Sequence, residues 1–487
     1  MTLRVLSIAS EAVPLIKTGG LADVVGALPD AVAPHGVAMT TILPGYPAVL
    51  KAVGKAKAIH QWDSLLGEPA RLLAGKLAGN LGSHPLLVVD SPNLFAREGG
   101  PYTDLAGRDW GDNWRRFAAF SRAAADVAGG AVKGLAFDVA HAHDWQAAMA
   151  PAYLRFAPAG VGTVPSIMTI HNMAFQGHYG SDIFALLELP SWAWAIDGVE
   201  YHGGVGFLKA GLESASAITT VSPTYAREIR DPAFGMGLEG LIAAKADRVS
   251  GIVNGIDPAV WNPETDAHLL QTYSWRSLSR RQANKRALER EFHLDQSDGP
   301  LFVCITRLTW QKGIDVLLEV IDHLVGLGGR LALLGSGDAA MEAGLHAAAA
   351  RHPGRVSLRI GYDEALSHRM QGGGDAILVP SRFEPCGLTQ LYGLAYGCVP
   401  VVAHTGGLAD TVVDANLAAI NSQAATGVAF HGVTYPSFAA AITRTIALYG
   451  QRDVWTQMQR TGMKTDFSWK RSGQAYAALY RQLAGAQ

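Results

Sequence analysis

A carboxylate and a potential anion site lie together at one strand end of this 487-residue chain. The apolar run 376–379 has the length of a buried parallel strand, and a polar elbow, residues 381–387, follows it. Glu384 lies in this elbow, ahead of a helix expected at 388–396. The helix start would offer three backbone N–H groups, those of Gly387, Leu388 and Thr389. Such groups attract anions such as phosphate, unless Glu384 only complements the helix dipole.

Histidines follow two expected strands in the first half of the chain. His141, His143 and Asp144 come at the end of one short strand, and His171 comes directly after another, residues 166–170. Imidazole and carboxylate side chains at this spacing are typical of metal ligands. A metal-dependent hydrolase is therefore one interpretation of these residues.

Three cations favour a different chemistry. Arg307 and Lys312 lie five residues apart between an expected strand and an expected helix, and Lys17 lies in a glycine-bounded loop. Each alone could be a solvated surface charge that contributes little. The hydrolase interpretation leaves all three of these cations without a role.

Strands and helices alternate along most of the chain, as in parallel α/β sheets. Strands are expected at residues 4–10, 39–43, 86–90, 138–141, 166–170, 217–221 and 249–253 in the first half and at 301–305, 331–334, 356–360, 376–379, 399–402 and 427–430 in the second. Several of them end in the polar clusters described above. Because ligands bind beyond the carboxyl ends of parallel strands, the sequence predicts a ligand site at these ends.

A short internal match indicates two similar halves. The hexapeptide Thr-Gly-Gly-Leu-Ala-Asp occurs at residues 18–23 and again at 405–410, each time before an expected helix. The turn-rich segment 254–258 lies between the halves and is the candidate hinge. The predicted organisation is two α/β domains, residues 1–253 and 254–465, and a final helical segment, residues 466–487.

The composition narrows the function classes. Hydrophobic residues make up 49% and charged residues 17%, which suits an α/β enzyme, and a net charge of −2 does not favour nucleic acid or an anionic membrane as partner. Three cysteines without metal-ligand spacing argue against a disulfide framework or a zinc ribbon. No apolar run reaches the length of a membrane span, and the N-terminus lacks the apolar core of a signal peptide. We therefore expect a cytoplasmic enzyme.

Six motifs in order resemble those of the bacterial and plant glycogen/starch synthases. They are Lys17-Thr18-Gly19-Gly20-Leu21, His141-Ala142-His143-Asp144-Trp145, His171-Asn172, Asn254-Gly255-Ile256-Asp257, the segment 307–313 (RLTWQKG) and the segment 382–390 (RFEPCGLTQ). The resemblance extends from about residue 4 to about residue 480. Each motif alone is weak, whereas six in the family's order and spacing are specific.

The resemblance implies both an architecture and a reaction. The architecture is two Rossmann-like domains facing across a cleft, the GT-B arrangement, with a final helix that crosses back to the N-terminal domain. The reaction is transfer of glucose from ADP-glucose to the 4-hydroxyl group at the non-reducing end of an α-1,4-glucan such as glycogen. It retains the anomeric configuration and needs no metal or other cofactor.

The resemblance also implies roles for individual residues. The catalytic set is Glu384, Arg307, Lys312, His171 and Asp144, with the two cations on the donor diphosphate and His171 near the glucose 6-hydroxyl. The donor-binding set is Lys17, Gly20, Asn254, Arg307, Lys312, Tyr362 beside the adenine, Cys386, Gly387, Leu388 and Thr389. The glucose and acceptor set is Tyr102, Asp144, Trp145 and His171. Many related retaining transferases bind the ribose through a glutamate at the position of Tyr392, so the ribose contact stays unassigned.

Three alternatives stay open at this point. The first is the metal-dependent hydrolase built on His141, His143 and Asp144, and the second is a related glucosyltransferase that uses UDP-glucose. The third is a glucan-binding or regulatory protein on the same fold. The intact Glu384 argues against lost catalysis, and the loop at residues 17–21 favours ADP-glucose. The sequence makes no prediction of oligomeric state.

Overall fold

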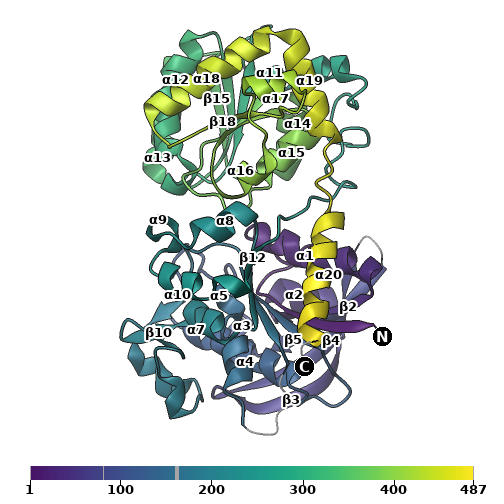
Figure 1. Ribbon diagram of the computed structural model, residues 1–487, viewed down its shortest axis with the longest axis vertical. Coiled ribbons are helices and arrows are strands. Elements are labelled where there is room, and N and C mark those ends of the chain that lie inside the picture. Colours follow the sequence, from purple (N-terminus) through teal and green to yellow (C-terminus); the bar gives the residue numbers. More distant parts are fainter. Residues whose placement is uncertain (1, 80–81, 159–163, 486–487) are drawn as a thin grey trace. The chain divides into compact units, whose positions relative to one another are not determined.

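The computed structural model describes residues 2–79, 82–158 and 164–485. The chain forms two compact units (Figure 1). Unit 1 comprises Met1–Gly255 together with Trp469–Gln487, and unit 2 comprises Ile256–Ser468. The units therefore change over after Gly255 and after Ser468, whereas the predicted domain boundaries fall after residues 253 and 465.

Unit 1 is built on a mixed sheet in the order β12-β11-β7-β6-β1-β2-β5-β4-β3. Its strands are β1 (Leu3–Ile8), β2 (Val37–Pro44), β3 (Lys57–Leu65), β4 (Glu68–Gly79), β5 (Gly82–Asp90), β6 (Val139–His143), β7 (Ser166–Ile170), β11 (Ala217–Thr220) and β12 (Val249–Gly251). Neighbouring strands from β12 to β5 pair in parallel, and β4 and β3 extend the sheet antiparallel. The chain winds outward from β1 to β2 and β5, then returns to β6 on the other side of β1. Such a reversal is the topological switch point at which doubly wound sheets bind ligands.

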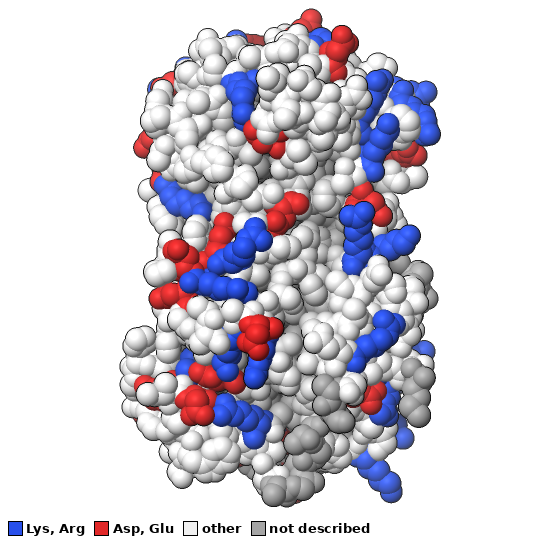
Figure 2. Space-filling model, viewed as in Figure 1, with Lys and Arg blue, Asp and Glu red and all other residues white. Residues whose placement is uncertain are grey.

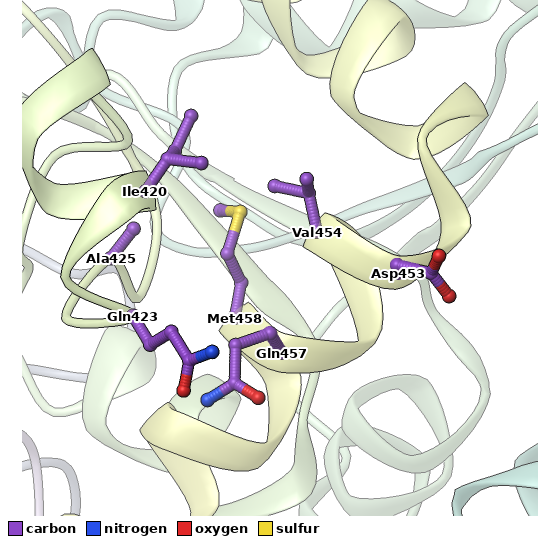
Figure 3. A pocket seen from close by; sticks show the side chains of 7 residues that line it. All are labelled: Ile420, Gln423, Ala425, Asp453, Val454, Gln457 and Met458. Atoms are coloured by element: carbon purple, nitrogen blue, oxygen red, sulfur yellow. The ribbon is translucent and has the colours of Figure 1, made fainter.

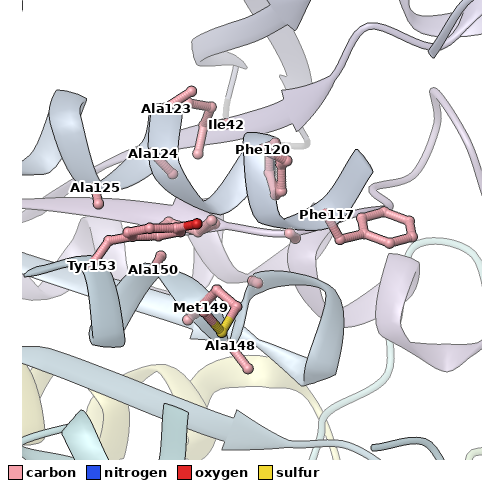
Figure 4. Packing of buried hydrophobic residues seen from close by; sticks show 14 of the residues in the cluster. Ile42, Phe117, Phe120, Ala123, Ala124, Ala125, Ala148, Met149, Ala150 and Tyr153 are labelled. Carbon is pink, nitrogen blue, oxygen red and sulfur yellow. The ribbon is translucent and has the colours of Figure 1, made fainter. Parts of the chain in front are cut away.

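The helices of unit 1 cover this sheet. They are α1 (Gly20–Val32), α2 (Pro47–Val53), α3 (Pro92–Phe95), α4 (Asn113–Ala128), α5 (Asp144–Ala147), α6 (Met149–Arg155), α7 (Phe207–Ser214), α8 (Pro223–Glu228), α9 (Pro232–Gly235), α10 (Glu239–Ala244) and α20 (Trp469–Gly485). A small antiparallel sheet adds β8 (His178–Tyr179), β9 (Glu200–Tyr201) and β10 (Gly204–Gly206). Figure 4 shows the core between two of the helices, where Phe120 of α4 faces the side of α6 that carries Met149 and Tyr153. Burying each such side chain contributes about 1.5–3 kcal/mol, so this packing holds the sheet edge in place.

The last helix, α20, packs on α1 of unit 1 (Figure 1). Tyr476, Ala477 and Tyr480 on α20 are fully buried in one cluster with Leu28 of α1. Gly473 permits the close approach, because a Cβ atom there would lie 2.1 Å from the carbonyl oxygen of Ala31. The final helical segment thus returns to the N-terminal unit, as the resemblance implied.

Unit 2 has a six-stranded parallel sheet in the order β15-β14-β13-β16-β17-β18. The strands are β13 (Leu301–Ile305), β14 (Arg330–Gly335), β15 (Val356–Ile360), β16 (Ala376–Val379), β17 (Val399–Ala403) and β18 (Val428–Phe430). The helices are α11 (Arg281–Glu291), α12 (Ile314–Gly326), α13 (Ala339–Arg351), α14 (Glu364–Gly373), α15 (Thr389–Tyr396), α16 (Gly406–Thr411), α17 (Leu417–Asn421), α18 (Tyr435–Gly450) and α19 (Arg452–Lys464). The order is that of a dinucleotide-binding sheet, with its switch point between β13 and β16.

The charges on the surface and the hydropathy of the helices agree with the small net charge and the absence of long apolar runs in the sequence. On the face that Figure 2 shows, lysine and arginine side chains are interspersed with aspartate and glutamate. Among the described residues, no helix is both long and apolar enough to cross a membrane.

Candidate active site

The switch point of unit 1 begins with a buried acid that sequence reasoning did not select. Glu11 follows β1 and is 2% exposed. Its carboxylate accepts hydrogen bonds from the backbone N–H of Thr18, from the Thr18 hydroxyl at 2.6 Å and from the hydroxyl of Tyr102. Tyr102 also lies 2.8 Å from the Ser10 hydroxyl. Glu11 therefore fixes both the loop that carries Lys17 and one predicted glucose-binding residue.

Lys17 lies on the outer side of that loop. Its ammonium group pairs with Asp23 at 2.8 Å, and about a third of its side chain is exposed. An exposed pair of this kind stabilises a protein only weakly, so the ammonium is available to a stronger anion. Gly20 begins α1, and the capping position before it, Gly19, supplies no side-chain cap.

Strand β6 extends two residues beyond the strand predicted at 138–141, so it contains His143 as well as His141. His141 and His143 are two residues apart, point to the same side and are fully buried. His141 bonds to the Tyr480 hydroxyl at 2.8 Å and to the Thr169 hydroxyl at 2.6 Å. A strand accommodates these polar rings because every imidazole nitrogen has a partner.

His143 reaches in the other direction, toward the end of the sheet. Its Nδ1 lies 3.0 Å from Nε2 of His171, and its Nε2 lies 3.2 Å from the Ser7 hydroxyl. Burial lowers the pKa of His141 and His171 to about 3, and it also lowers that of His143 well below its usual range. The three rings are therefore neutral near pH 7 and act as hydrogen-bonding groups.

These rings do not form a metal centre. Within the described part of the chain, no group of three or more His, Cys, Asp and Glu side chains is arranged to hold a metal ion. The nitrogens of His141 and His143 are all engaged by hydroxyl groups or by His171. The geometry therefore gives the hydrolase interpretation no ligand set.

Asp144 opens α5 in a left-handed backbone conformation, with φ of 55°, and is 8% exposed. Its Oδ1 accepts the backbone N–H groups of His171 at 2.7 Å and Asn172 at 3.4 Å. Burial raises the pKa of Asp144 to about 7, although these bonds oppose the rise. Such backbone geometry in a non-glycine residue is frequent at functional sites, and here it ties Asp144 to His171.

Two further predicted residues of unit 1 are partly or fully removed from solvent. Trp145 is half buried, and its ring lies edge-on to Phe117 at a centroid distance of 5.0 Å. Asn254 is 6% exposed, and within the described structure its side-chain oxygen has no hydrogen-bond partner. A buried oxygen without a partner costs free energy unless a ligand supplies a donor.

The switch point of unit 2 brings two predicted residues into contact. The Lys312 ammonium lies 2.5 Å from Oε2 of Glu384, and the hydroxyl of Ser381 donates to the same oxygen at 2.8 Å. Glu384 is 7% exposed and Ser381 is 1% exposed. Arg307 is exposed, and in the described residues its guanidinium has no ion pair. Two cations thus follow β13, the first strand of this sheet: Lys312, which is paired with Glu384, and Arg307, which is exposed.

The elbow that carries Glu384 is fixed by close backbone packing. Gly387 has φ of 71°, a conformation that favours glycine. The backbone N–H of Gly407 donates to the Glu384 carbonyl at 3.0 Å, and a Cβ atom at Gly407 would lie 2.0 Å from the Cys386 carbonyl oxygen. The second copy of the repeated hexapeptide therefore supports the elbow.

The other predicted residues of unit 2 each have different neighbours. Helix α15 begins at Thr389, and its capping residue Leu388 supplies no side-chain hydrogen bond. The thiol of Cys386 is buried. Tyr362 is 73% exposed and donates to Glu364 at 2.8 Å. Tyr392 stacks on Trp261 at a centroid distance of 3.6 Å, so a ring packs where related transferases carry the ribose acid.

The structure thus gathers two clusters and adds residues to both. In unit 1, Asp144 joins His171, and Tyr102 joins the Lys17 loop. In unit 2, Lys312 joins Glu384. The residues that sequence reasoning missed are Glu11, Ser381, His143 as a partner of His171, and Ser7. Glu11 directly follows the first strand, and Ser381 begins the elbow, so position after a strand was a usable signal for both.

A surface hollow of about 190 Å³ lies elsewhere in unit 2, between α17 and α19. Figure 3 shows its lining, in which Gln423 and Gln457 lie beside Met458 and Val454. Ligand sites typically enclose about 300–1,000 Å³. The hollow is smaller than that and shares no residue with either cluster.

Comparison with known proteins assigns both halves of the chain. The family described as starch synthase catalytic domain matches residues 4–244, and the family of group 1 glycosyl transferases matches residues 285–461. The chain is 75% identical to a glycogen synthase of Novosphingobium aromaticivorans and 57% identical to one of Mesorhizobium japonicum, over 99% of each chain. The fold is similar to the catalytic domain of starch synthase IV from Arabidopsis thaliana bound to ADP and acarbose, with a TM-score of 0.87 and 30% identity over the full length of both chains.

Proposed function

The chain belongs to the glycogen/starch synthase family, and we propose that it elongates α-1,4-glucan chains with glucose from ADP-glucose. In this reaction the 4-hydroxyl at the non-reducing end of the glucan replaces ADP at the anomeric carbon, with retention of configuration. The observation that carries the proposal is the Lys312–Glu384 pair at the switch point of a dinucleotide-binding sheet. It combines a cation and a carboxylate where a nucleotide sugar would bind.

Departure of ADP leaves negative charge on its diphosphate, and cations near the elbow are suited to take up that charge. We assign Arg307 and Lys312 to the diphosphate. Arg307 is exposed and has no ion pair in the described structure, and Lys312 is paired only with Glu384 and can exchange that partner for a phosphate. The backbone N–H groups at residues 387–389 add the partial positive charge of a helix start. Lys17, Gly20 and Asn254 complete the proposed donor set, with Tyr362 as a stacking surface for the adenine.

Glu384 is assigned an electrostatic role. Its Oε2 already holds the Lys312 ammonium and the Ser381 hydroxyl, which orients the carboxylate and reduces its nucleophilicity. A carboxylate in this position would stabilise positive charge developing on the sugar or accept a glucose hydroxyl. Retention then results from attack of the 4-hydroxyl on the face that ADP leaves, without a covalent glycosyl-enzyme.

The groups of unit 1 suit the sugar and the acceptor. His171 is neutral near pH 7. Asp144, whose pKa is about 7, can hold or release a proton at that pH, and the two residues are buried in contact with each other. Neutral groups that donate and accept hydrogen bonds match sugar hydroxyls, which carry no charge. Trp145 and Tyr102 add aromatic surface for glucan rings. ADP-glucose and glycogen are the proposed substrates, and the cytoplasm is the proposed compartment.

The proposal is tested by following nucleotide release from ADP-glucose and UDP-glucose, each with and without glycogen, in excess chelator. We expect ADP release that requires glycogen and lengthens its chains. UDP-glucose should react at least about tenfold more slowly, the equivalent of about 1.4 kcal/mol. Equal release without glycogen would identify a hydrolase, and loss of activity that added magnesium or manganese restores would refute the metal-free reaction.

A further inference from the structure

A buried hydrogen-bond chain leads from strand β1 to His171. It consists of the Ser7 hydroxyl, the two ring nitrogens of His143 and Nε2 of His171, with contacts of 3.2 and 3.0 Å. Ser7 and His143 are fully buried, and His171 is 9% exposed. No solvent therefore competes for these bonds, and the three groups must satisfy one another.

The direction of this chain decides which proton His171 carries. A neutral imidazole has one donor and one acceptor nitrogen. If Ser7 donates to His143, then His143 donates through Nδ1, and His171 accepts at Nε2 and carries its proton on Nδ1. If the chain runs the other way, His171 donates through Nε2, His143 donates to Ser7, and the Ser7 proton needs another acceptor.

The surroundings of Ser7 favour the first direction. In the described residues, the Ser7 hydroxyl has His143 as its only hydrogen-bond partner. The reverse direction would leave a fully buried hydroxyl proton without an acceptor, which costs more than a hydrogen bond contributes. With Ser7 as donor, each proton shared between Ser7, His143 and His171 has an acceptor.

We propose that His143 and Ser7 are positioning residues that hold His171 in the tautomer protonated on Nδ1, so that His171 offers an N–H donor to a sugar hydroxyl. The sugar as ligand rests on the proposed function, whereas the tautomer does not. Nε2 of His171 faces the protein interior in this arrangement, and Nδ1 is the ring nitrogen left for a ligand. The ring cannot flip without breaking the contact to His143, and it cannot change tautomer without reversing the hydrogen bonds and leaving the buried Ser7 proton without an acceptor.

His141 provides a matched control in the same strand. Its ring lies 4.0 Å from that of His143, centroid to centroid, and it is equally buried. Its hydrogen bonds go to Tyr480 of α20 and to Thr169, and neither goes to His171. Loss of His141 should therefore weaken the packing of α20 without changing the proton on His171.

The tautomer is tested by nitrogen NMR of histidine-labelled protein without substrate. We expect the His171 resonances to show a protonated Nδ1 and an unprotonated Nε2 between pH 6 and 8. Ser7→Ala removes the first donor with little change in volume, and the His143 and His171 signals should then show a mixture of tautomers. A wild-type His171 protonated on Nε2 would overturn the proposal, and so would unchanged signals in Ser7→Ala.

The consequence for turnover is tested with three further variants. His143→Leu should lower kcat/KM for ADP-glucose about tenfold, on the scale of one mispositioned hydrogen bond. His143→Asn places an amide N–H near the former Nδ1 and should recover most of that loss. His141→Leu should lower the unfolding temperature and leave kcat/KM within about twofold, below the effect of a lost hydrogen bond. Equal losses in the two leucine variants would contradict the positioning role.

The two experiments separate this proposal from the proposed function. If the wild-type protein released no nucleotide from any donor, the function would fail while the NMR result would still decide the tautomer. If His143→Leu does not fold, Ser7→Ala supplies the kinetic comparison, with an expected loss of about threefold because one hydrogen bond in the chain disappears. Wild-type kinetics and wild-type NMR signals in Ser7→Ala would together refute the role of Ser7.

Discussion

The two units use the same topological position for opposite electrostatics. In unit 1, Asp144 lies at the switch point between β1 and β6, and its carboxyl accepts the backbone N–H groups of His171 and Asn172. In unit 2, Glu384 lies at the switch point between β13 and β16 and is paired with a lysine. The same topological position thus carries uncharged groups in unit 1 and a charged pair in unit 2.

The repeated hexapeptide also places identical residues in different surroundings in the two units. A Cβ atom at Gly19, in the first copy, would meet no other atom within 4 Å. A Cβ atom at Gly406 would lie 2.0 Å from the Glu384 carbonyl oxygen, and one at Gly407 would be as close to the Cys386 carbonyl oxygen. Identical residues therefore leave open space in unit 1 and support the elbow in unit 2.

The largest expected effect concerns the uncharged acid of unit 1. Asp144→Asn should flatten the pH dependence of stability, because asparagine accepts the same N–H groups, tolerates positive φ and does not ionise. Between pH 4 and 7 folded Asp144 keeps a proton that the unfolded chain has lost, so the wild-type free energy of unfolding falls as pH rises through this window. At about 1.4 kcal/mol per pH unit between pKa values of 3.8 and about 7, the upper limit is about 4 kcal/mol.

Urea unfolding of wild type and Asp144→Asn at pH 4, 5.5 and 7 measures this difference. Asp182→Asn, at an exposed position of the same unit, is the control and should keep the wild-type slope. A slope that Asp144→Asn leaves unchanged would show that Asp144 is charged at pH 5.5, and the contrast between the two acids would be lost.

The paired acid of unit 2 should control turnover. Glu384→Ala is expected to lower kcat at least about a hundredfold, roughly 2.7 kcal/mol, the scale for losing one preorganised electrostatic group. Because the change also releases Lys312, Lys312→Met in the same assay shows how much of the loss comes from the freed cation. Steady-state kinetics of the folded variants measures both, and near-normal turnover of Glu384→Ala would remove Glu384 from the catalytic set.

The two copies of the hexapeptide predict unequal effects of the same substitution. Gly406→Ala, at the position equivalent to Gly19, should destabilise the protein by about 2 kcal/mol, because the new methyl group overpacks against the Glu384 carbonyl and φ of 45° disfavours a side chain. Gly19→Ala should change stability by less than about 0.5 kcal/mol, since nothing lies within contact distance. Denaturant midpoints of the two variants measure the difference. Equal midpoints would mean that the second copy does not support the elbow.

Sequence patterns were sufficient for the parallel strands of both sheets and for the elbow. Buried parallel strands are short apolar runs bounded by polar residues, and β16 occupies the predicted residues 376–379. The prediction ended β6 two residues early, at residue 141, because the polar His143 resembles a loop residue until its buried partners are known. The antiparallel strands β3 and β4 carry no comparable apolar run, and their boundaries were not predicted.

The site was predictable as residue types but not as contacts. Glu384, Lys312, Asp144 and His171 were selected from their positions after strands and from the family motifs. Their partners are distant in sequence: the Tyr102 hydroxyl bonds to Glu11, and Ser7 lies against His143. No periodicity encodes such pairs, because they depend on how β1 and β6 are placed side by side. The stacking of Tyr392 on Trp261 was beyond sequence reasoning for the same reason.

The smallest expected effect concerns Lys17, the one cation of unit 1 that we assign to the donor. Lys17→Gln should raise the KM for ADP-glucose about tenfold, equivalent to about 1.4 kcal/mol, and change the KM for glycogen less. Arginine should substitute only in part, because the lysine ammonium is a compact charge on a flexible stem. Asp23→Asn is the control, because it removes the 2.8 Å ion pair and leaves the ammonium in place. If Lys17 matters only through that pair, both variants will have the same kinetics. If Lys17 binds the donor, Asp23→Asn will keep a KM near the wild-type value and Lys17→Gln will not. An unchanged KM in both variants would show that Lys17 is a surface charge without a role in donor binding.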